Sequence, residues 1–132
     1  MAITNWEKDE IKKAGAFLEK LGYIRKEDPY SIEYNLNNIR ISVVYPPCEE
    51  ESDVAIRFIR ENKYFSIGWI AMVRDDIKGS KDKLANAKEL LKYFENHYLQ
   101  IKNCQYCMES YDLVDKYVEE HWEKSGGVYR NS

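Results

Sequence analysis

The chain has 132 residues, of which 44% are hydrophobic and 33% charged, and its formal net charge at pH 7 is −3. This length is typical of one folded domain, and an aromatic content of 14%, with eleven tyrosines, is too high for a disordered chain. The small negative charge argues against a dedicated nucleic-acid-binding protein, which needs a basic surface. We therefore expect a single domain over residues 1–132 without a nucleic-acid partner.

The compartment is indicated by what the sequence lacks. No apolar run approaches the roughly 20 residues that cross a bilayer, and acidic residues stand where a signal peptide would have its apolar core: Glu7, Asp9 and Glu10. Three cysteines in a chain without an export signal are expected to be reduced thiols. These features predict a cytoplasmic protein without a membrane partner.

The first predicted element is an N-terminal amphipathic helix. Thr4 and Glu7 form a capping box, in which each side chain accepts a hydrogen bond from the backbone N–H of the other residue. Apolar residues then recur at helical spacing: Ile11, Ala14, Phe17, Leu18 and Leu21. Gly22 supplies the left-handed position that ends such a helix. Residues 23–24 can begin a short extra strand before Pro29.

Two strands joined by a tight turn are predicted next, at 30–36 and 39–45. Apolar and polar residues alternate in both segments, and Asn37-Asn38 tolerates the positive φ that a type I′ turn requires at both central positions. This turn places three apolar pairs on one face of the sheet: Leu36 with Ile39, Tyr34 with Ile41, and Ile32 with Val43.

A second strand pair is predicted at 54–58 and 65–73, where apolar residues stand at every second position. A turn at Asn62-Lys63 would again match apolar residues across the pair: Phe58 with Ile67, Ile56 with Trp69, and Val54 with Ala71. The opposite face of the sheet is only half polar, because its polar residues are accompanied by four apolar ones: Val44, Ile59, Ile70 and Met72. We therefore expect another element or a partner to cover part of that face.

Two long helices complete the chain. The first carries a seam with steps of three and four residues: Leu84, Ala87, Leu91, Phe94, Tyr98 and Ile101. Asn103 can cap the second helix, whose apolar stripe consists of Met108, Tyr111, Val114, Tyr117 or Val118, and Trp122. The complete prediction is an α+β fold: an N-terminal helix, a four-stranded antiparallel meander, and a C-terminal antiparallel helical hairpin packed on the sheet.

Catalytic and metal chemistry have few candidates. Cys104 and Cys107 form a C-x-x-C pair, but the pair follows a helix, whereas the thioredoxin pattern follows a strand. A zinc site would have to add Cys48 and His97. Ordinary packing is favoured over both alternatives. Neither His97 nor His121 lies in a nucleophile motif. We therefore nominate no catalytic residue, metal ligand or cofactor, although a missing motif does not exclude catalysis.

Two acidic segments are the candidate partner-binding residues. One is the loop after Pro46-Pro47, with Glu49, Glu50, Glu51 and Asp53. The other is a strip on the last helix, where Asp112, Asp115, Glu119 and Glu123 fall on one face. Each can be a solvated surface, and the loop can also protect a sheet edge. Together they would suit a basic protein partner, such as a nucleic-acid-cleaving toxin domain. We therefore expect a non-enzymatic protein-binding module.

The aromatic residues support an alternative hypothesis. Tyrosines and tryptophans have an apolar ring with a polar tip, so they can line a small-ligand pocket as well as a core. A cavity above roughly 300 Å³ with converging polar groups would favour a small-ligand-binding or enzymatic domain over a protein-binding module.

The order of these features resembles the small bacterial immunity proteins of polymorphic or contact-dependent toxin systems. The resemblance rests on a helix ending in Leu21-Gly22-Tyr23, a meander with the acidic loop 46–51, and C-terminal helices without a catalytic motif. It covers most of the chain at the level of architecture and allows no transfer of individual residues. It implies a cytoplasmic inhibitor that blocks a toxin through charged surface residues.

Overall fold

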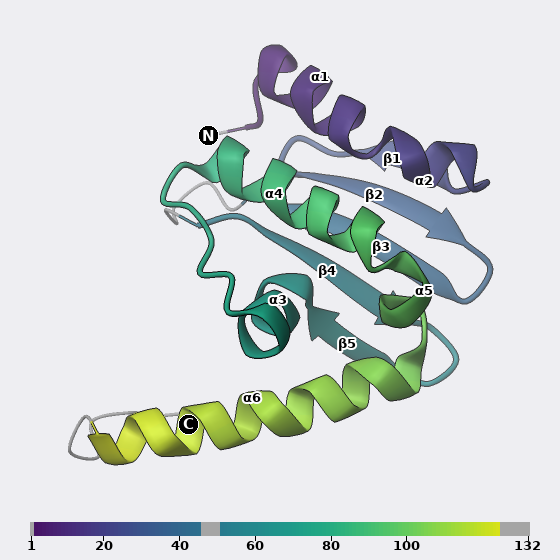
Figure 1. Cartoon of the computed structure of the whole chain (residues 1–132). Helices are drawn as coiled ribbons and strands as arrows, with labels where there is room; N and C mark the ends of the chain where they lie inside the picture. The colour runs from purple at the N-terminus through teal and green to yellow at the C-terminus, as the bar shows by residue number, and fades with distance from the viewer. Residues whose placement is uncertain (1, 46–50, 125–132) are drawn as a thin grey trace.

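The computed structural model describes residues 2–45 and 51–124, which form an α+β fold with a five-stranded antiparallel sheet in the order β1-β2-β3-β4-β5 (Figure 1). The elements are α1 (Asn5–Ala14), α2 (Ala16–Lys20), β1 (Ile24–Glu27), β2 (Ser31–Leu36), β3 (Ile39–Val44), β4 (Asp53–Phe58), β5 (Lys63–Ser66), α3 (Ile67–Asp75), α4 (Lys83–Asn96), α5 (Tyr98–Ile101) and α6 (Cys104–Lys124). The predicted fold class is confirmed at this level, but the strand count and the arrangement of the last helices differ from the prediction.

The N-terminal helix has the predicted ends and an unexpected break. The side chain of Thr4 accepts a hydrogen bond from Glu7 N, and the Glu7 carboxylate accepts one from Thr4 N, so the capping box is present. Gly22 has a φ of 104° just after the last turn, as predicted. The helix is interrupted at Gly15, where a Cβ atom would lie 2.5 Å from the hydroxyl oxygen of Tyr34. A larger residue at this position would force the Tyr34 ring to shift.

The first strand pair has the predicted register. Leu36 pairs with Ile39, Tyr34 with Ile41, and Ile32 with Val43. Among the turn residues only Asn37 has a positive φ, of 51°, so the expected type I′ geometry at both asparagines is wrong. The possible extra strand is β1, which pairs with β2 at the edge of the sheet.

The second strand pair is shorter than predicted, and its register is wrong. Phe58 pairs with Lys63, and Ile56 pairs with Phe65, because the turn consists of residues 59–62. The two registers differ by four residues, an even number, so both keep the same side chains on the same face. Hydrophobic alternation therefore could not distinguish them. Trp69 and Ala71, predicted to be strand residues, lie in α3.

The helix α3 replaces the second half of the predicted strand. Ser66 caps it, since its side chain accepts a hydrogen bond from Trp69 N at 3.2 Å. Three of its residues are fully buried at helical spacing: Ile67, Ile70 and Ala71. Burial at i, i+3 and i+4 is typical of a helix that packs on one side.

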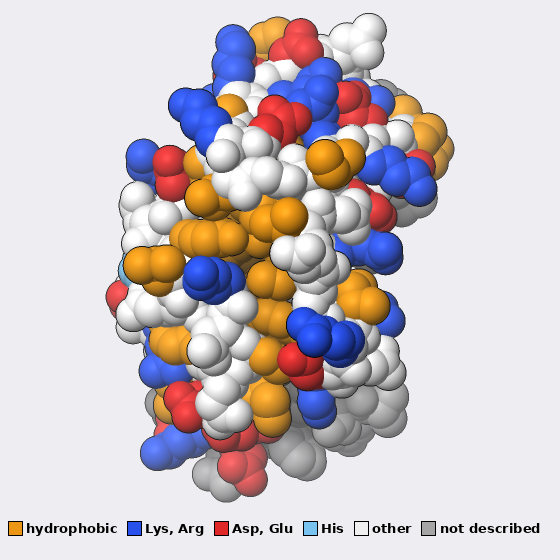
Figure 2. Space-filling model, turned by 90° about the vertical axis from the view of Figure 1, so that its right-hand side faces the viewer, with side chains coloured by type: hydrophobic (Ala, Val, Ile, Leu, Met, Phe, Trp, Pro, Cys, Tyr) orange, Lys and Arg blue, Asp and Glu red, His pale blue; other side chains and the backbone are white. Residues whose placement is uncertain are grey.

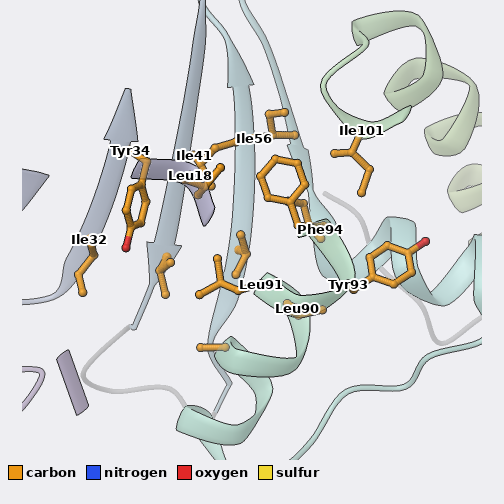
Figure 3. Packing of buried hydrophobic residues seen from close by; sticks show 14 of the residues in the cluster. Leu18, Ile32, Tyr34, Ile41, Ile56, Leu90, Leu91, Tyr93, Phe94 and Ile101 are labelled. Carbon is orange, nitrogen blue, oxygen red and sulfur yellow. The ribbon is translucent and has the colours of Figure 1, made fainter. Parts of the chain in front are cut away.

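The main core lies between the sheet and α1, α2 and α4. In Figure 3 the side chains of Tyr34, Ile41 and Ile56 come from the strands, and those of Leu91 and Phe94 come from α4, within one continuous cluster. All five are fully buried. The predicted seam therefore faces the sheet, although the helix is interrupted at His97, where α4 ends and α5 begins.

The predicted C-terminal helical hairpin is wrong. After α5 the chain turns away, and α6 packs along α3 and the end of β5 (Figure 1). The Tyr111 hydroxyl accepts a hydrogen bond from Ser66 N at 2.7 Å, and the Ser110 hydroxyl accepts one from Arg74 Nε at 2.9 Å. α6 therefore packs on α3, an element that the prediction did not contain.

One face of the sheet carries the helices, and much of the opposite face is open (Figure 1). Some residues on the open face are strongly exposed, including Ile24 at 72% and Tyr64 at 60%. Ile70 and Met72, which the predicted strand would have placed there, belong to α3. No helix in the described residues combines the length and the apolar character needed to cross a membrane.

Candidate functional site

A cleft is present where β5 ends and α3 begins. The strand β5 pairs with β4 only as far as Ser66, opposite Ala55, so the first residues of β4 have no fifth-strand neighbour. The first turn of α3 and the segment 77–80 lie beside this gap and form a cleft of about 490 Å³ with residues of β3, β4 and α4. The cleft therefore results from the short β5, which the sequence analysis did not predict.

Asp53 lies at the cleft and is largely enclosed. Its Oδ1 accepts hydrogen bonds from Val54 N at 2.8 Å and from Gly68 N at 3.2 Å. Burial raises the pKa of the Asp53 carboxyl, and hydrogen bonds from Ser66, Val54 and Gly68 oppose that rise. No lysine, arginine or histidine nitrogen among the described residues lies within 4.0 Å of this carboxylate. The side chain therefore joins β4 to α3 and is not displayed on a loop.

A buried asparagine holds the other wall of the cleft. Asn86 Nδ2 donates to the backbone oxygen of Ser52 at 2.8 Å, and its Oδ1 accepts from Ser80 N at 3.1 Å. The Ser52 hydroxyl donates to the backbone oxygen of Lys83 at 2.7 Å. Gly79, with a φ of 66°, passes so close that a Cβ atom would lie 2.8 Å from Asn86 Oδ1. These polar groups are largely satisfied by one another.

The remaining wall is aromatic. Tyr64 is 60% exposed and Trp69 is 39% exposed, and both line the cleft. The Trp69 ring meets the Tyr117 ring of α6 edge to face, with the centroids 6.1 Å apart. Sequence reasoning placed Trp69 in the core of a strand. The helical spacing of Ile67, Ile70 and Ala71 was the signal that could have placed it correctly.

The acidic loop is only partly described. Glu49 and Glu50 lie outside the described residues, as do Pro46, Pro47 and Cys48. Glu51 is exposed and lines the mouth of the cleft. Glu51 and Asp53, two of the predicted partner-binding acids, therefore meet at the cleft, one exposed and one enclosed.

The acidic strip on α6 lies opposite the packed side of the helix. Cys107, Ser110 and Val114 are buried, whereas Asp112, Asp115 and Glu119 are exposed. None of these three acids has a salt bridge with a described residue. The side chain of Glu123, the fourth predicted member, lies outside what the structure describes. Asp112 and Glu119 are separated by about 10 Å along the helix axis.

The two described thiols, Cys104 and Cys107, and both histidines are engaged in packing contacts. Cys107 is fully buried, and its Sγ donates to the backbone oxygen of Ile101 at 3.1 Å. Burial raises the pKa of the Cys107 thiol to about 12 and also raises that of Cys104. A redox pair needs at least one lowered thiol pKa. Within the described part of the chain, no three His, Cys, Asp or Glu side chains gather where they could hold a metal ion. His97 stacks on Tyr93 with the ring centroids 4.1 Å apart.

A second exposed surface is apolar. Figure 2 shows the side of the molecule at which the turns of the sheet and α5 lie, and hydrophobic side chains form a band down its middle beside lysine and arginine side chains. Two large apolar residues in these segments are exposed: Ile59 in the turn between β4 and β5, and Leu99 in α5, at 76%. Exposed apolar patches of this kind are typical of surfaces that contact another protein.

The comparisons with known proteins returned no relative. The chain matches no protein-family model, and no curated protein or solved structure is significantly similar to it.

Proposed function

We propose that the chain is a non-enzymatic, cytoplasmic protein-binding module that binds a cationic protein through the acidic strip of α6. The observation that carries this proposal is that Asp112, Asp115 and Glu119 are exposed together and have no basic partner among the described residues. A strip about 10 Å long is comparable to the Debye length in 0.1 M salt. The three charges therefore act on an approaching cation together.

The strip suits a protein partner better than a small ion. α6 has 21 residues, and the described part of the chain packs against one side of it, so its outer side is a convex surface. Complementary charge on such a surface accelerates encounter and excludes partners of the same sign. The apolar band on another side of the molecule offers further contact area (Figure 2). In this proposal the partner is a basic toxin domain and the chain is its immunity protein, as the resemblance in architecture suggests.

Capture from the native host tests this proposal with matched baits. The tagged chain is compared with Asp115→Lys and with Glu89→Lys, which changes the net charge equally at an exposed residue of α4. We expect a basic protein to be recovered by the unchanged chain and by Glu89→Lys, and to be lost with Asp115→Lys. Recovery of the same proteins by all three baits would show that α6 is not the binding surface.

A small-ligand-binding function at the cleft is the second candidate. A specific observation favours it, because the cleft volume of about 490 Å³ lies above the lower limit of roughly 300 Å³ for ligand pockets. Tyr64 and Trp69 offer flat walls, and Asp53 offers a carboxyl with a raised pKa, which enzymes use in acid–base chemistry. Against it, the hydrogen bonds of Asp53 and Asn86 are made within the protein.

A thermal-shift screen of small molecules separates the two functions. A compound that raises the melting temperature of the unchanged chain but not of Trp69→Ala would favour the cleft as a ligand site. Failure of every compound, combined with partner loss in Asp115→Lys, would favour the protein-binding module.

A further inference from the structure

Two arginines oppose each other on the open face of the sheet. Arg40 on β3 and Arg57 on β4 are directly paired in the β3–β4 register, and both are exposed. Like charges directly opposite each other across two strands destabilise a sheet. The fold is therefore expected to contain a contact that offsets the repulsion between these two arginines.

The side-chain contacts offset little of this repulsion. Arg40 Nε donates to Asn35 Oδ1 at 2.9 Å, and Arg57 Nη2 donates to Asn62 Oδ1 at 3.0 Å. Both acceptors are neutral, so they orient the guanidinium groups without cancelling their charges. Glu33 Oε1 lies 3.8 Å from Arg40 Nε, at the limit of an ion pair. Arg57 has no carboxylate within 4.0 Å among the described residues.

A depression lies at the arginine pair. It has a volume of about 150 Å³ and is lined by Glu33, Arg40, Ser42, Ala55, Arg57 and Tyr64. Ala55, on β4 two residues before Arg57, has a side chain short enough to leave this space. The hydroxyl groups of Ser42 and Tyr64 can also donate hydrogen bonds, in addition to the guanidinium N–H groups that the asparagine contacts do not use.

We propose that this depression is an oxyanion-binding site, in which a phosphate or carboxylate group lies between Arg40 and Arg57. A guanidinium presents a planar fork of N–H donors that matches both groups. The anion cancels the repulsion between the two cations, and the asparagine contacts hold both forks in place before it arrives. This site is independent of the acidic strip, so either proposal can fail without the other.

Thermal unfolding of the full chain at constant ionic strength tests the site, with chloride replaced by inorganic phosphate in one series and by acetate in another. At ten times its Kd, a bound anion should raise the melting temperature on the order of 5 °C. A response to phosphate alone would indicate a phosphoryl ligand, whereas a response to acetate as well would indicate that carboxylates also bind. Titration should also shift the NMR signals of the Arg40 and Arg57 Nε–H groups.

Three variants distinguish a site from a general effect of charge or of phosphate on water. Arg57→Gln should lose the response to the anion, and in chloride alone it should melt no lower than the unchanged chain because the repulsion is gone. Ala55→Ile should also lose the response, since it fills the depression and keeps both charges. Arg60→Gln removes the same charge from the exposed turn that follows β4 and should keep the response.

Two results would overturn the proposal. One is the absence of any response to phosphate or acetate in the unchanged chain. The other is a response of equal size in Arg57→Gln, Ala55→Ile and Arg60→Gln, because it would then depend on the protein as a whole and not on the depression.

Discussion

Removal of the Tyr34 hydroxyl is predicted to increase the stability of the folded protein. Tyr34 is fully buried beneath Gly15, and its Oη has no hydrogen-bond partner among the described residues. Burial raises the pKa of Tyr34 to about 12. An unsatisfied buried hydroxyl costs about 1–3 kcal/mol. The small space left by the missing oxygen offsets a few tenths of a kcal/mol of that gain.

We therefore expect Tyr34→Phe to increase the free energy of unfolding by about 1 kcal/mol or more, which corresponds to about 4 °C in melting temperature for a chain of this size. Tyr23→Phe is the matched control, because Tyr23 is also buried but its hydroxyl lies 3.0 Å from that of Tyr98. Loss of this bond should decrease the free energy of unfolding by about 0.5–1.5 kcal/mol.

Urea denaturation followed by circular dichroism measures both variants, provided that the m-value is unchanged. Opposite signs for the two substitutions would support the structure at this position. If Tyr34→Phe destabilised the protein as much as Tyr23→Phe, the Tyr34 hydroxyl would have to make a hydrogen bond, and the reasoning would be refuted.

Three further predictions concern the core, the cleft and the thiols. Gly15→Ala should destabilise the protein, although alanine has the better helix propensity. The loss should be smaller in the Tyr34→Phe background, because the Tyr34 hydroxyl oxygen, the atom closest to the new Cβ, is then absent. A double-mutant cycle from urea denaturation measures this coupling. Asp53→Asn can keep both backbone hydrogen bonds of this side chain. Because burial raises the pKa of Asp53 in the folded state, the unchanged chain should become less stable relative to this variant as the pH rises through that pKa. A difference in unfolding free energy between the two proteins that is equal at pH 4 and pH 7 would contradict this. In a variant whose only thiol is Cys107, labelling at pH 7 should require unfolding, and rapid labelling of the native protein would contradict the burial of that side chain.

The first strand pair was predictable because two independent constraints agreed. The turn at Asn37 and the alternation of apolar residues both require the pairing of Tyr34 with Ile41, and a slip of one residue would have exposed the whole row. At the second pair the alternation alone decided the register. Two registers that differ by four residues satisfy this alternation equally, and the prediction took the one with the longer second strand.

The helix α3 was missed for a related reason. Residues 65–73 contain apolar side chains at every second position, which favours a strand, but Ile67, Ile70 and Ala71 also satisfy helical spacing. Tertiary packing decides between the two, since α6 covers the apolar side of α3. The error extended to α6, which was expected to lie along α4.

The candidate site was predictable only in part. The acids of α6 could be placed on one exposed side because helical periodicity depends on the chain alone. Asp53 could not be placed, because its surroundings depend on where β5 ends and on Gly68, which comes from an element that was not predicted. The opposition of Arg40 and Arg57 follows from the correct face assignment but also needs the β3–β4 register, which no turn residue specifies.

The affinity of the captured partner for single charge-reversal variants tests the proposed function most directly. With the salt concentration varied, Asp115→Lys should weaken binding about tenfold or more in low salt, and the difference should shrink as salt is raised. Glu89→Lys, which changes the net charge equally, should remain within about twofold of the unchanged chain, because its charge lies on α4, outside the proposed surface. Equal weakening by both substitutions would show that only the net charge matters and would contradict the assignment of the binding surface to α6.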